Sequence, residues 1–256
     1  MSLASIGYIN AHSLFGPYAR REYFLADANQ VSTFTNSRRH IRLRGCYDSP
    51  GMRELLLNID REVTSPGFTR LKDDGTTTVG ITSRDGRRLV IKRYNTKNAW
   101  HFLRRSIRRS RAQNCFEFGL ELARNDIATA PVVGFVETRA GPLRGRSWLI
   151  TEYVEGSQCL SYVLDNANQR QAAEIAARLE REFVKLASLN ITHGDMKASN
   201  FILRENRFPV LIDLDGMRHH RNDSTYAAAH QRDLERFMKN WRERPELSIC
   251  FTKVKW

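Results

Sequence analysis

One short polar loop constrains the possible folds of this chain of 256 residues more than any other feature. The loop occupies residues 193–200, after a predicted amphipathic helix at 172–189, and an apolar strand follows it. A second apolar strand, 210–212, is followed directly by Asp213. Because a hairpin of the two strands would bring Asp213 close to Asn200, we expect an amide and a carboxylate to share one site, where they could bind magnesium ions.

The residue types of the loop fit the needs of phosphoryl transfer. That reaction takes metal-binding groups, a cation on the nucleotide phosphates and a carboxylate that orients the attacking hydroxyl. Asp195, Asn200 and Asp213 are candidates for such roles, although each of them taken singly could be an ordinary turn residue that caps a strand. Their joint spacing, together with the order of the segments upstream, favours the catalytic interpretation.

The residues before this loop predict a small, sheet-rich lobe. Stretches rich in β-branched and apolar residues alternate with turn signals, which predicts an antiparallel sheet and a helix from about 99 to 124 after the third strand. Five strands are expected, at 68–71, 76–81, 88–92, 132–137 and 147–153. From residue 156 onward the pattern is mainly helical.

This order of elements predicts an α+β, bilobal fold with the chemistry between the two lobes. We expect the first lobe, a five-stranded antiparallel sheet plus a helix, over residues 66–154, and a mainly helical lobe over 155–256. Residues 1–65 contain a basic run at 38–44 and a short helical pattern. We expect them to form an N-terminal extension, to which we assign no role.

The sequences HGDMKASN at 193–200 and IDLDG at 212–216 resemble two segments of the protein-kinase-like superfamily. They are similar to its catalytic loop and metal-binding segment, in the form found in small-molecule and lipopolysaccharide kinases, with Gly194 where eukaryotic protein kinases have arginine. The resemblance implies a bilobal protein-kinase-like fold that uses ATP and Mg²⁺. The resemblance implies that Asp195 is the catalytic base and that Lys197 contacts the transferring phosphate. It implies that Asn200 and Asp213 bind magnesium.

Lys92 ends the third predicted strand and is similar to the lysine that holds the α- and β-phosphates of ATP in this superfamily. The resemblance implies that a glutamate on the following helix pairs with it. Glu117 and Glu121 lie one turn apart on that helix, and we predict that Glu117 is the partner. The alternative is that either glutamate simply faces solvent.

The expected phosphate-covering loop departs from the glycine-rich pattern of protein kinases. Of that pattern only Gly75 and Gly80 remain, which argues against a protein kinase more than against ATP binding. We assign Gly75 to the nucleotide site. By the same resemblance, residues 150–156 connect the lobes, and backbone groups of Glu152 and Val154 would hydrogen-bond adenine.

A net charge of +13 indicates an anionic partner, and cations concentrate at residues 92–111. Arginines there alternate with apolar residues such as Trp100 and Phe102, a make-up typical of a helix on an anionic membrane surface. Arginines also clamp phosphorylated sugars, and the plainest alternative is a lobe helix whose arginines are solvated. No nucleic-acid-binding motif accompanies the segment, so we expect no nucleic-acid partner.

A closer resemblance covers about residues 68–241. The sequences IATAPVVGFVE at 127–137 and ITHGDMKASNF at 191–201, with the basic tryptophan-containing segment, are similar to bacterial lipopolysaccharide core kinases of the WaaP and InaA type. Those enzymes phosphorylate heptose or Kdo sugars of the lipid A-core at the cytoplasmic face of the membrane. The resemblance implies a lipopolysaccharide acceptor and a peripheral position on the bacterial inner membrane.

Two other functions stay open. One is a kinase of another small molecule or of protein side chains, and the other is a non-catalytic nucleotide-binding regulator. The presence of Lys92, Asp195, Asn200 and Asp213 together speaks against the regulator.

The cysteines and the apolar runs bear on the compartment. Four scattered cysteines lack the spacing of a zinc site, which indicates reduced structural thiols. No apolar run approaches the length of a membrane span. We therefore expect a cytoplasmic protein that does not cross the membrane.

Overall fold

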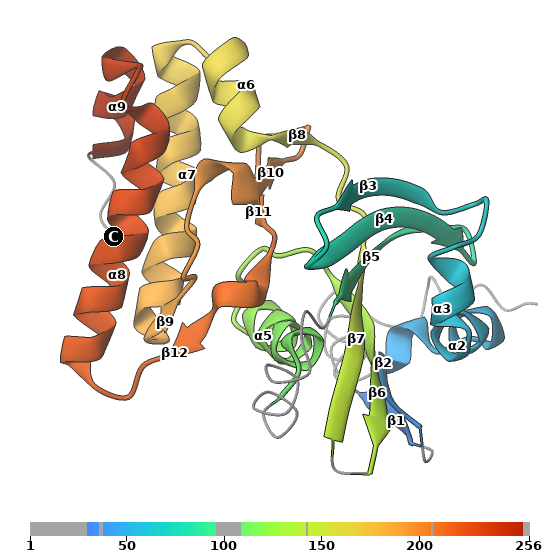
Figure 1. Ribbon diagram of the computed structural model, residues 1–256. Helices are drawn as coiled ribbons and strands as arrows, with labels where there is room; N and C mark the ends of the chain where they lie inside the picture. The colour runs from blue at the N-terminus through green and yellow to red at the C-terminus, as the bar shows by residue number, and fades with distance from the viewer. Residues whose placement is uncertain (1–29, 36–37, 96–108, 142, 206, 253–256) are drawn as a thin grey trace, which may run out of the picture.

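The computed structural model describes residues 30–35, 38–95, 109–141, 143–205 and 207–252. Figure 1 shows an antiparallel sheet on one side of helix α5 (Arg111–Arg124) and a mainly helical part on the other side. The mixed composition of helices and antiparallel strands agrees with the expected α+β class and is compatible with a kinase-like fold.

The sheet has seven strands in the order β1-β2-β6-β7-β5-β4-β3, and neighbouring strands are antiparallel. In chain order they are β1 (Val31–Thr35), β2 (Arg39–Arg44), β3 (Thr69–Asp73), β4 (Thr77–Arg84), β5 (Arg87–Tyr94), β6 (Val132–Ala140) and β7 (Leu143–Glu152). Strands β3 to β7 lie where the sequence predicts five strands. Lys92 of β5 is aligned with Leu149 of β7 and with Val79 of β4, which places it well inside the sheet.

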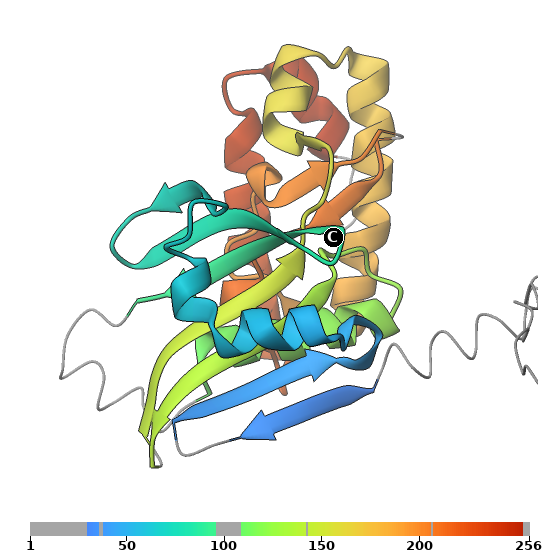
Figure 2. The same cartoon turned by 90° about the vertical axis from the view of Figure 1, so that its right-hand side faces the viewer.

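The prediction of a five-stranded sheet is wrong, because β1 and β2 add two strands at one edge (Figure 2). Both come from residues 1–65, which we expected to form an extension. In β2, Ile41 and Leu43 are buried and arginines occupy the positions between and after them. That alternation is the two-residue period of a strand, but the arginines also make the segment look like a simple basic run.

Helices cover both faces of the sheet (Figures 1 and 2). Helix α2 (Pro50–Leu57), followed by α3 (Ile59–Glu62), packs in one cluster with Val136 and Trp148. Helix α5 packs in the other cluster with Phe135 and Leu149. Because neighbouring residues of a strand point to opposite faces, β6 and β7 contribute to both clusters.

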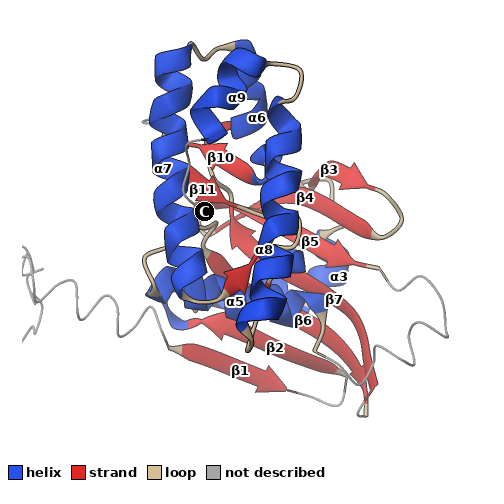
Figure 3. Ribbon diagram, turned by 90° about the vertical axis from the view of Figure 1, so that its left-hand side faces the viewer, coloured by secondary structure: helices blue, strands red, loops and turns tan. Residues whose placement is uncertain are grey.

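The helical part contains α6 (Cys159–Asp165), α7 (Gln169–Ser188), α8 (Asp223–Met238) and α9 (Pro245–Thr252), and Figure 3 shows α7 and α8 running along its length. Helix α7 begins with a capping box of Asn168 and Gln171, which satisfies two otherwise unpaired backbone N–H groups. Its predicted apolar face is confirmed, since Ile175, Leu179, Phe183 and Leu186 are all buried.

Short strands and 3₁₀ helices complete the described parts of the chain. They are η1 (Gly45–Tyr47), β8 (Ser157–Gln158), β9 (Ile191–Thr192), η2 (Ala198–Asn200), β10 (Phe201–Leu203), β11 (Pro209–Leu211), η3 (Leu214–Gly216), β12 (Arg218–His219) and η4 (Lys239–Trp241). The predicted hairpin after the polar loop is present as β10 and β11. Within the described ranges, no helix combines the length and the apolar composition needed to cross a membrane.

Candidate active site

The loop from His193 to Asn200 is held by a buried carboxylate on α8. The Asp233 side chain, only 4% exposed, accepts hydrogen bonds from the backbone N–H groups of His193 at 2.8 Å, Gly194 at 2.9 Å and Met196 at 3.4 Å. Hydrogen bonds to a charged acceptor are stronger than those between neutral groups. Asp233 therefore fixes the path of the backbone on both sides of Asp195.

The loop also lies directly against the segment that follows β11. Gly194 has a φ of +78°, and a Cβ atom there would lie 2.5 Å from the carbonyl oxygen of Gly216. A Cβ atom at Gly216 would meet the carbonyl oxygen of His193 at 2.6 Å. Gly216 is required by this close approach, and Gly194 is required both by the close approach and by its positive φ.

The His193 imidazole is completely buried behind the loop. Its Nε2–H donates to the carbonyl oxygen of Ile212 at 3.3 Å, which ties the loop to the end of the β10–β11 hairpin. Burial lowers the pKa of His193, although the nearby carboxylate of Asp233 opposes the shift. The ring is thus a neutral support for the loop and is not exposed to a substrate.

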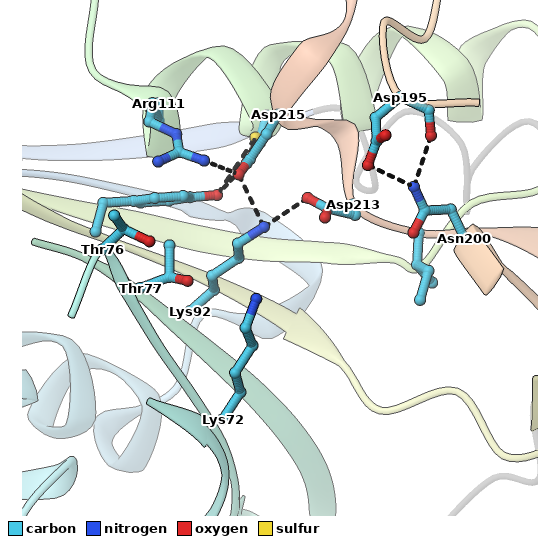
Figure 4. Close-up of polar contacts among 12 residues, drawn as sticks. Lys72, Thr76, Thr77, Lys92, Arg111, Asp195, Asn200, Asp213 and Asp215 are labelled. Carbon is cyan, nitrogen blue, oxygen red and sulfur yellow. Dashed lines mark hydrogen bonds and ion pairs between the residues drawn. The ribbon is translucent and has the colours of Figure 1, made fainter. Parts of the chain in front are cut away.

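Asp195 lies beside Asn200 (Figure 4), and its carboxylate also contacts Lys197 of the same loop. Its carboxylate is 42% exposed, with Oδ2 2.9 Å from the Lys197 ammonium and Oδ1 3.7 Å from Nε of Arg236. The Asn200 amide nitrogen donates to the backbone carbonyl of Asp195 at 2.9 Å. This bond uses the nitrogen of Asn200 and leaves its side-chain oxygen as a possible metal ligand.

Asp213 follows the hairpin in a left-handed conformation, with a φ of +60°. Non-glycine residues seldom adopt it, and such residues are frequent at functional sites. The backbone N–H of Ile212 donates to the carbonyl of Asn200 at 2.8 Å, which brings Asp213 beside Asn200 as predicted.

Asn200 and Asp213 carry the amide and carboxylate oxygen atoms that magnesium accepts as ligands, and these two residues could hold such an ion. Among the described residues there is no group of three or more His, Cys, Asp or Glu side chains that could hold a metal. Magnesium does not need one, since it keeps several waters and is commonly held by one or two carboxylates together with substrate phosphates.

Lys92 lies between two carboxylates (Figure 4). Its Nζ atom is 2.5 Å from Oδ1 of Asp213 and 2.8 Å from Oδ2 of Asp215. Burial alone would lower the pKa of Lys92, but Asp215 and Asp213 more than offset it and raise the pKa. Burial in turn favours a raised pKa for Asp215, yet Lys92 and Arg111 lower that pKa to about 2. Lys92 and Asp215 are therefore both charged.

The predicted pair of Lys92 with a glutamate of α5 is not formed. Glu117 pairs with Arg42 of β2, and Glu121 lies 2.8 Å from Nε2 of His219. The face of α5 that approaches Lys92 carries Arg111 and Cys115 instead, one helical turn apart.

The loop between β3 and β4 is held together by the carboxylate of one of its own residues, Asp74. Gly75 has a φ of +72° at the turn, and the Asp74 carboxylate accepts the backbone N–H groups of Thr76 at 3.0 Å and Thr77 at 2.8 Å. Lys72 lies 2.9 Å from the same carboxylate, and these interactions lower the pKa of Asp74. Figure 4 shows that Lys72, Thr76 and Thr77 lie on the Lys92 side of the site.

The segment expected to contact adenine begins at the end of β7. The N–H of Glu152 already donates to the carbonyl of Pro131 at 2.8 Å, and its side chain pairs with Arg87. Val154 is 9% exposed. The Glu152 N–H is thus committed within the fold, and any adenine contact must come from other backbone groups of this segment.

A comparison with families of known proteins shows to which family the chain belongs. Residues 69–256, well over half of the chain, match the lipopolysaccharide kinase (Kdo/WaaP) family. The chain belongs to this family. A search of curated proteins gave no match.

Membership of the lipopolysaccharide kinase (Kdo/WaaP) family implies phosphotransferase activity and supports a sugar kinase role. The matched region begins at β3 and includes Lys92, the polar loop and Asp213. Strands β1 and β2 precede it, so this chain extends the sheet of the family region at one edge.

The basic segment predicted at 92–111 is described only at its ends, and residues 96–108 lie outside the described residues. Both ends supply a cation to the site. Lys92 contacts Asp215 from β5, and Arg111 contacts the same oxygen of Asp215 at 2.5 Å from the first turn of α5.

Two site residues were missed by the interpretation of the sequence. Asp233 lies one turn before the buried Phe237 on the inward face of α8, so an acidic residue on an apolar face was the available signal. Asp215 was visible as the second carboxylate after β11, but nothing in the sequence tells which of two neighbouring aspartates faces a lysine from another strand.

Proposed function

We propose that this protein is an ATP-dependent kinase that phosphorylates a sugar hydroxyl, of heptose or Kdo, in the inner core of lipopolysaccharide. The proposal is carried by two groups of side chains that lie together (Figure 4) in a member of the lipopolysaccharide kinase (Kdo/WaaP) family. One is the partly exposed Asp195 beside Lys197, and the other is Lys92 beside Asp213. Phosphoryl transfer depends mainly on positioning and charge, which such a pair of groups can supply.

On this proposal Asp195 orients the sugar hydroxyl and accepts its proton. The carboxylate is 42% exposed, so an acceptor can reach it, while Asp233 fixes the backbone behind it. Lys197 lies 2.9 Å away on the same loop, where its ammonium can contact the phosphoryl group as negative charge shifts between its oxygens.

Lys92 would hold the α- and β-phosphates of ATP from the sheet. Asn200 and Asp213 would bind the magnesium ions, which supply positive charge that neutralises the nucleotide phosphates. Gly75 and the backbone after Glu152 would lie over the phosphates and beside the adenine, respectively.

We further propose that the enzyme works on the cytoplasmic face of the bacterial inner membrane as a peripheral protein. Two facts support this: the family to which the chain belongs and its net charge of +13, which favours an anionic surface and a phosphorylated acceptor. The segment 92–111 is our candidate for the membrane contact.

The test is a transfer reaction with defined acceptors. The full-length protein is incubated with MgATP and deep-rough lipopolysaccharides truncated at known sugars, and mass spectrometry locates the added phosphate. We expect one phosphate on a heptose or Kdo residue. Transfer only to a soluble small molecule or a protein would indicate another kinase, and MgATP binding without any transfer would indicate a regulator.

Membrane binding has a separate test. Co-sedimentation with vesicles that contain an anionic phospholipid should carry the protein into the pellet, and neutral vesicles should not. Absence of binding to the anionic vesicles would favour a soluble acceptor.

A further inference from the structure

We propose that Asp215, and not a glutamate of α5, positions Lys92 for the nucleotide phosphates and thereby leaves Asp213 to the metal. The inference rests on the proposed function for the nucleotide but not for the sugar. It concerns the placement of a positioning residue: Asp215 would act through Lys92 and would not touch the reacting atoms.

Asp215 is built into the site from several sides. Its side chain is 14% exposed, and Oδ2 contacts Lys92 at 2.8 Å and Arg111 at 2.5 Å. The other oxygen, Oδ1, accepts from the hydroxyl of Tyr94 at 2.5 Å and from the thiol of Cys115 at 2.9 Å. Four side chains from β5 and α5 therefore converge on this one carboxylate, as Figure 4 shows for Lys92 and Arg111.

Asp213 is held in a different way. Its side chain is 39% exposed, and within the described ranges Lys92 is its one ion-pair partner. A carboxylate with open positions can accept a hydrated magnesium ion. One that already accepts from four donors, a guanidinium group among them, cannot do so without losing them. The two aspartates thus have different roles: Asp213 is suited to bind the metal ion, and Asp215 is suited to hold Lys92 in an ion pair.

The donors on α5 explain why the carboxylate comes from the segment after β11. The helix turns Arg111 and Cys115 toward Lys92, and both of them donate. Its two candidate acceptors are engaged elsewhere, Glu117 by Arg42 and Glu121 by His219. With donors on the sheet and on the helix, the acceptor has to be supplied by the third element, which is η3.

The arrangement has a consequence for nucleotide binding. When Asp213 turns to a metal ion, Lys92 keeps a carboxylate partner through its contact with Asp215 at 2.8 Å. Without Asp215, Asp213 would be the lysine's remaining carboxylate, and Lys92 would compete with the metal for it. Loss of such a supporting contact commonly costs about 10- to 100-fold in metal affinity or activity.

The experiment measures binding of a fluorescent ATP analogue to the full-length protein as Mg²⁺ is titrated. Asp215→Asn should weaken nucleotide binding about 10- to 100-fold and raise the Mg²⁺ concentration needed for half-maximal binding. Glu117→Gln and Glu121→Gln are matched controls on α5, and each should change binding less than about twofold. No acceptor is present, so the result is independent of whether the sugar assignment holds.

A double-mutant cycle separates positioning from a general loss of structure. If Asp215 acts through Lys92, Asp215→Asn should have no further effect in a Lys92→Ala background. Equal effects in both backgrounds would overturn the proposal, and so would wild-type Mg²⁺ dependence in Asp215→Asn. Should that variant fail to fold, Asp215→Glu serves instead and the glutamate controls still decide: weakened binding in Glu117→Gln or Glu121→Gln would overturn it.

Discussion

The two halves of the site are held in different ways. The Asp195 half is fixed by backbone hydrogen bonds to Asp233, a carboxylate that is only 4% exposed. The Lys92 half is fixed by ion pairs that join Lys92 of β5 and Arg111 of α5 to the two aspartates after β11. The geometry of the Asp195 half therefore depends on the folding of the helical part alone. The geometry of the Lys92 half depends on how the sheet, helix α5 and the segment after β11 pack against one another.

This difference predicts different costs when each half is damaged. In the Asp195 half, loss of an anchor leaves buried N–H groups without partners, so stability and activity should fall together. In the Lys92 half, the outer members of the ion pairs, Arg111 and Asp213, are 41% and 39% exposed, so removing one of them should lower activity more than stability.

Asp233→Ala should have the largest effect on stability. Three backbone N–H groups lose their acceptor, and we expect the free energy of unfolding to fall by about 3 kcal/mol, with turnover reduced about 100-fold. Urea unfolding and phosphate transfer measure the two effects. Glu235→Ala, an exposed acid on the same helix, is the control and should change stability by less than about 0.5 kcal/mol. Similar values for both variants would contradict the anchoring role.

Gly194→Ala should follow. The new Cβ atom would meet the carbonyl oxygen of Gly216 at 2.5 Å, so the loop must move away from the segment that follows β11. We expect about 2 kcal/mol of lost stability and a clear loss of transfer.

Gly86→Ala separates this contact from backbone strain. Gly86 has a similar φ of +71°, but a Cβ atom there meets nothing within 4 Å. It should lose stability through strain alone and keep full transfer activity. If Gly194→Ala behaved like Gly86→Ala, the close approach would have no functional importance.

Arg111→Met should have a smaller effect on stability but a measurable one on activity. It removes one of the two cations on Asp215, and we expect kcat/KM for ATP to fall about tenfold while stability changes by less than about 1 kcal/mol. Arg109→Met, at an exposed neighbouring position, is the matched control. A loss of stability as large as that of Asp233→Ala would remove the distinction between the two halves.

Arg42→Gln should have the smallest effect. It frees Glu117 from its half-buried ion pair, at a cost within about 1 kcal/mol, and should leave the KM for ATP unchanged. A changed KM would mean that Glu117 is coupled to Lys92 after all, and it would weaken the contrast drawn here.

The features that could be predicted from the sequence are those that depend on local patterns. The polar loop, the hairpin after it and the apolar face of α7 follow from local patterns, and the structure contains all three. Strands β3 to β7 could be predicted from the sequence in the same way. Strand β2 was not predicted, because the arginines beside Ile41 and Leu43 make the segment look like a basic run instead of an alternating strand.

The partner of Lys92 could not be predicted because it depends on three-dimensional arrangement. Lys92 and Asp213 are separated by 121 positions in the chain. Whether α5 turns Cys115 or Glu117 toward Lys92 depends on the rotation of a helix about its axis, and residues two positions apart lie on different faces. Local pattern gives the helix but not its rotation.

On the proposed function, Asp195 is the group that activates a lipopolysaccharide sugar hydroxyl. The most direct measurement compares the wild-type protein with Asp195→Asn for MgATP binding and for phosphate transfer to deep-rough lipopolysaccharide. We predict unchanged MgATP binding and a loss of transfer of about 1,000-fold, because the variant cannot accept the proton of the hydroxyl. Transfer by Asp195→Asn near the wild-type rate would contradict the account.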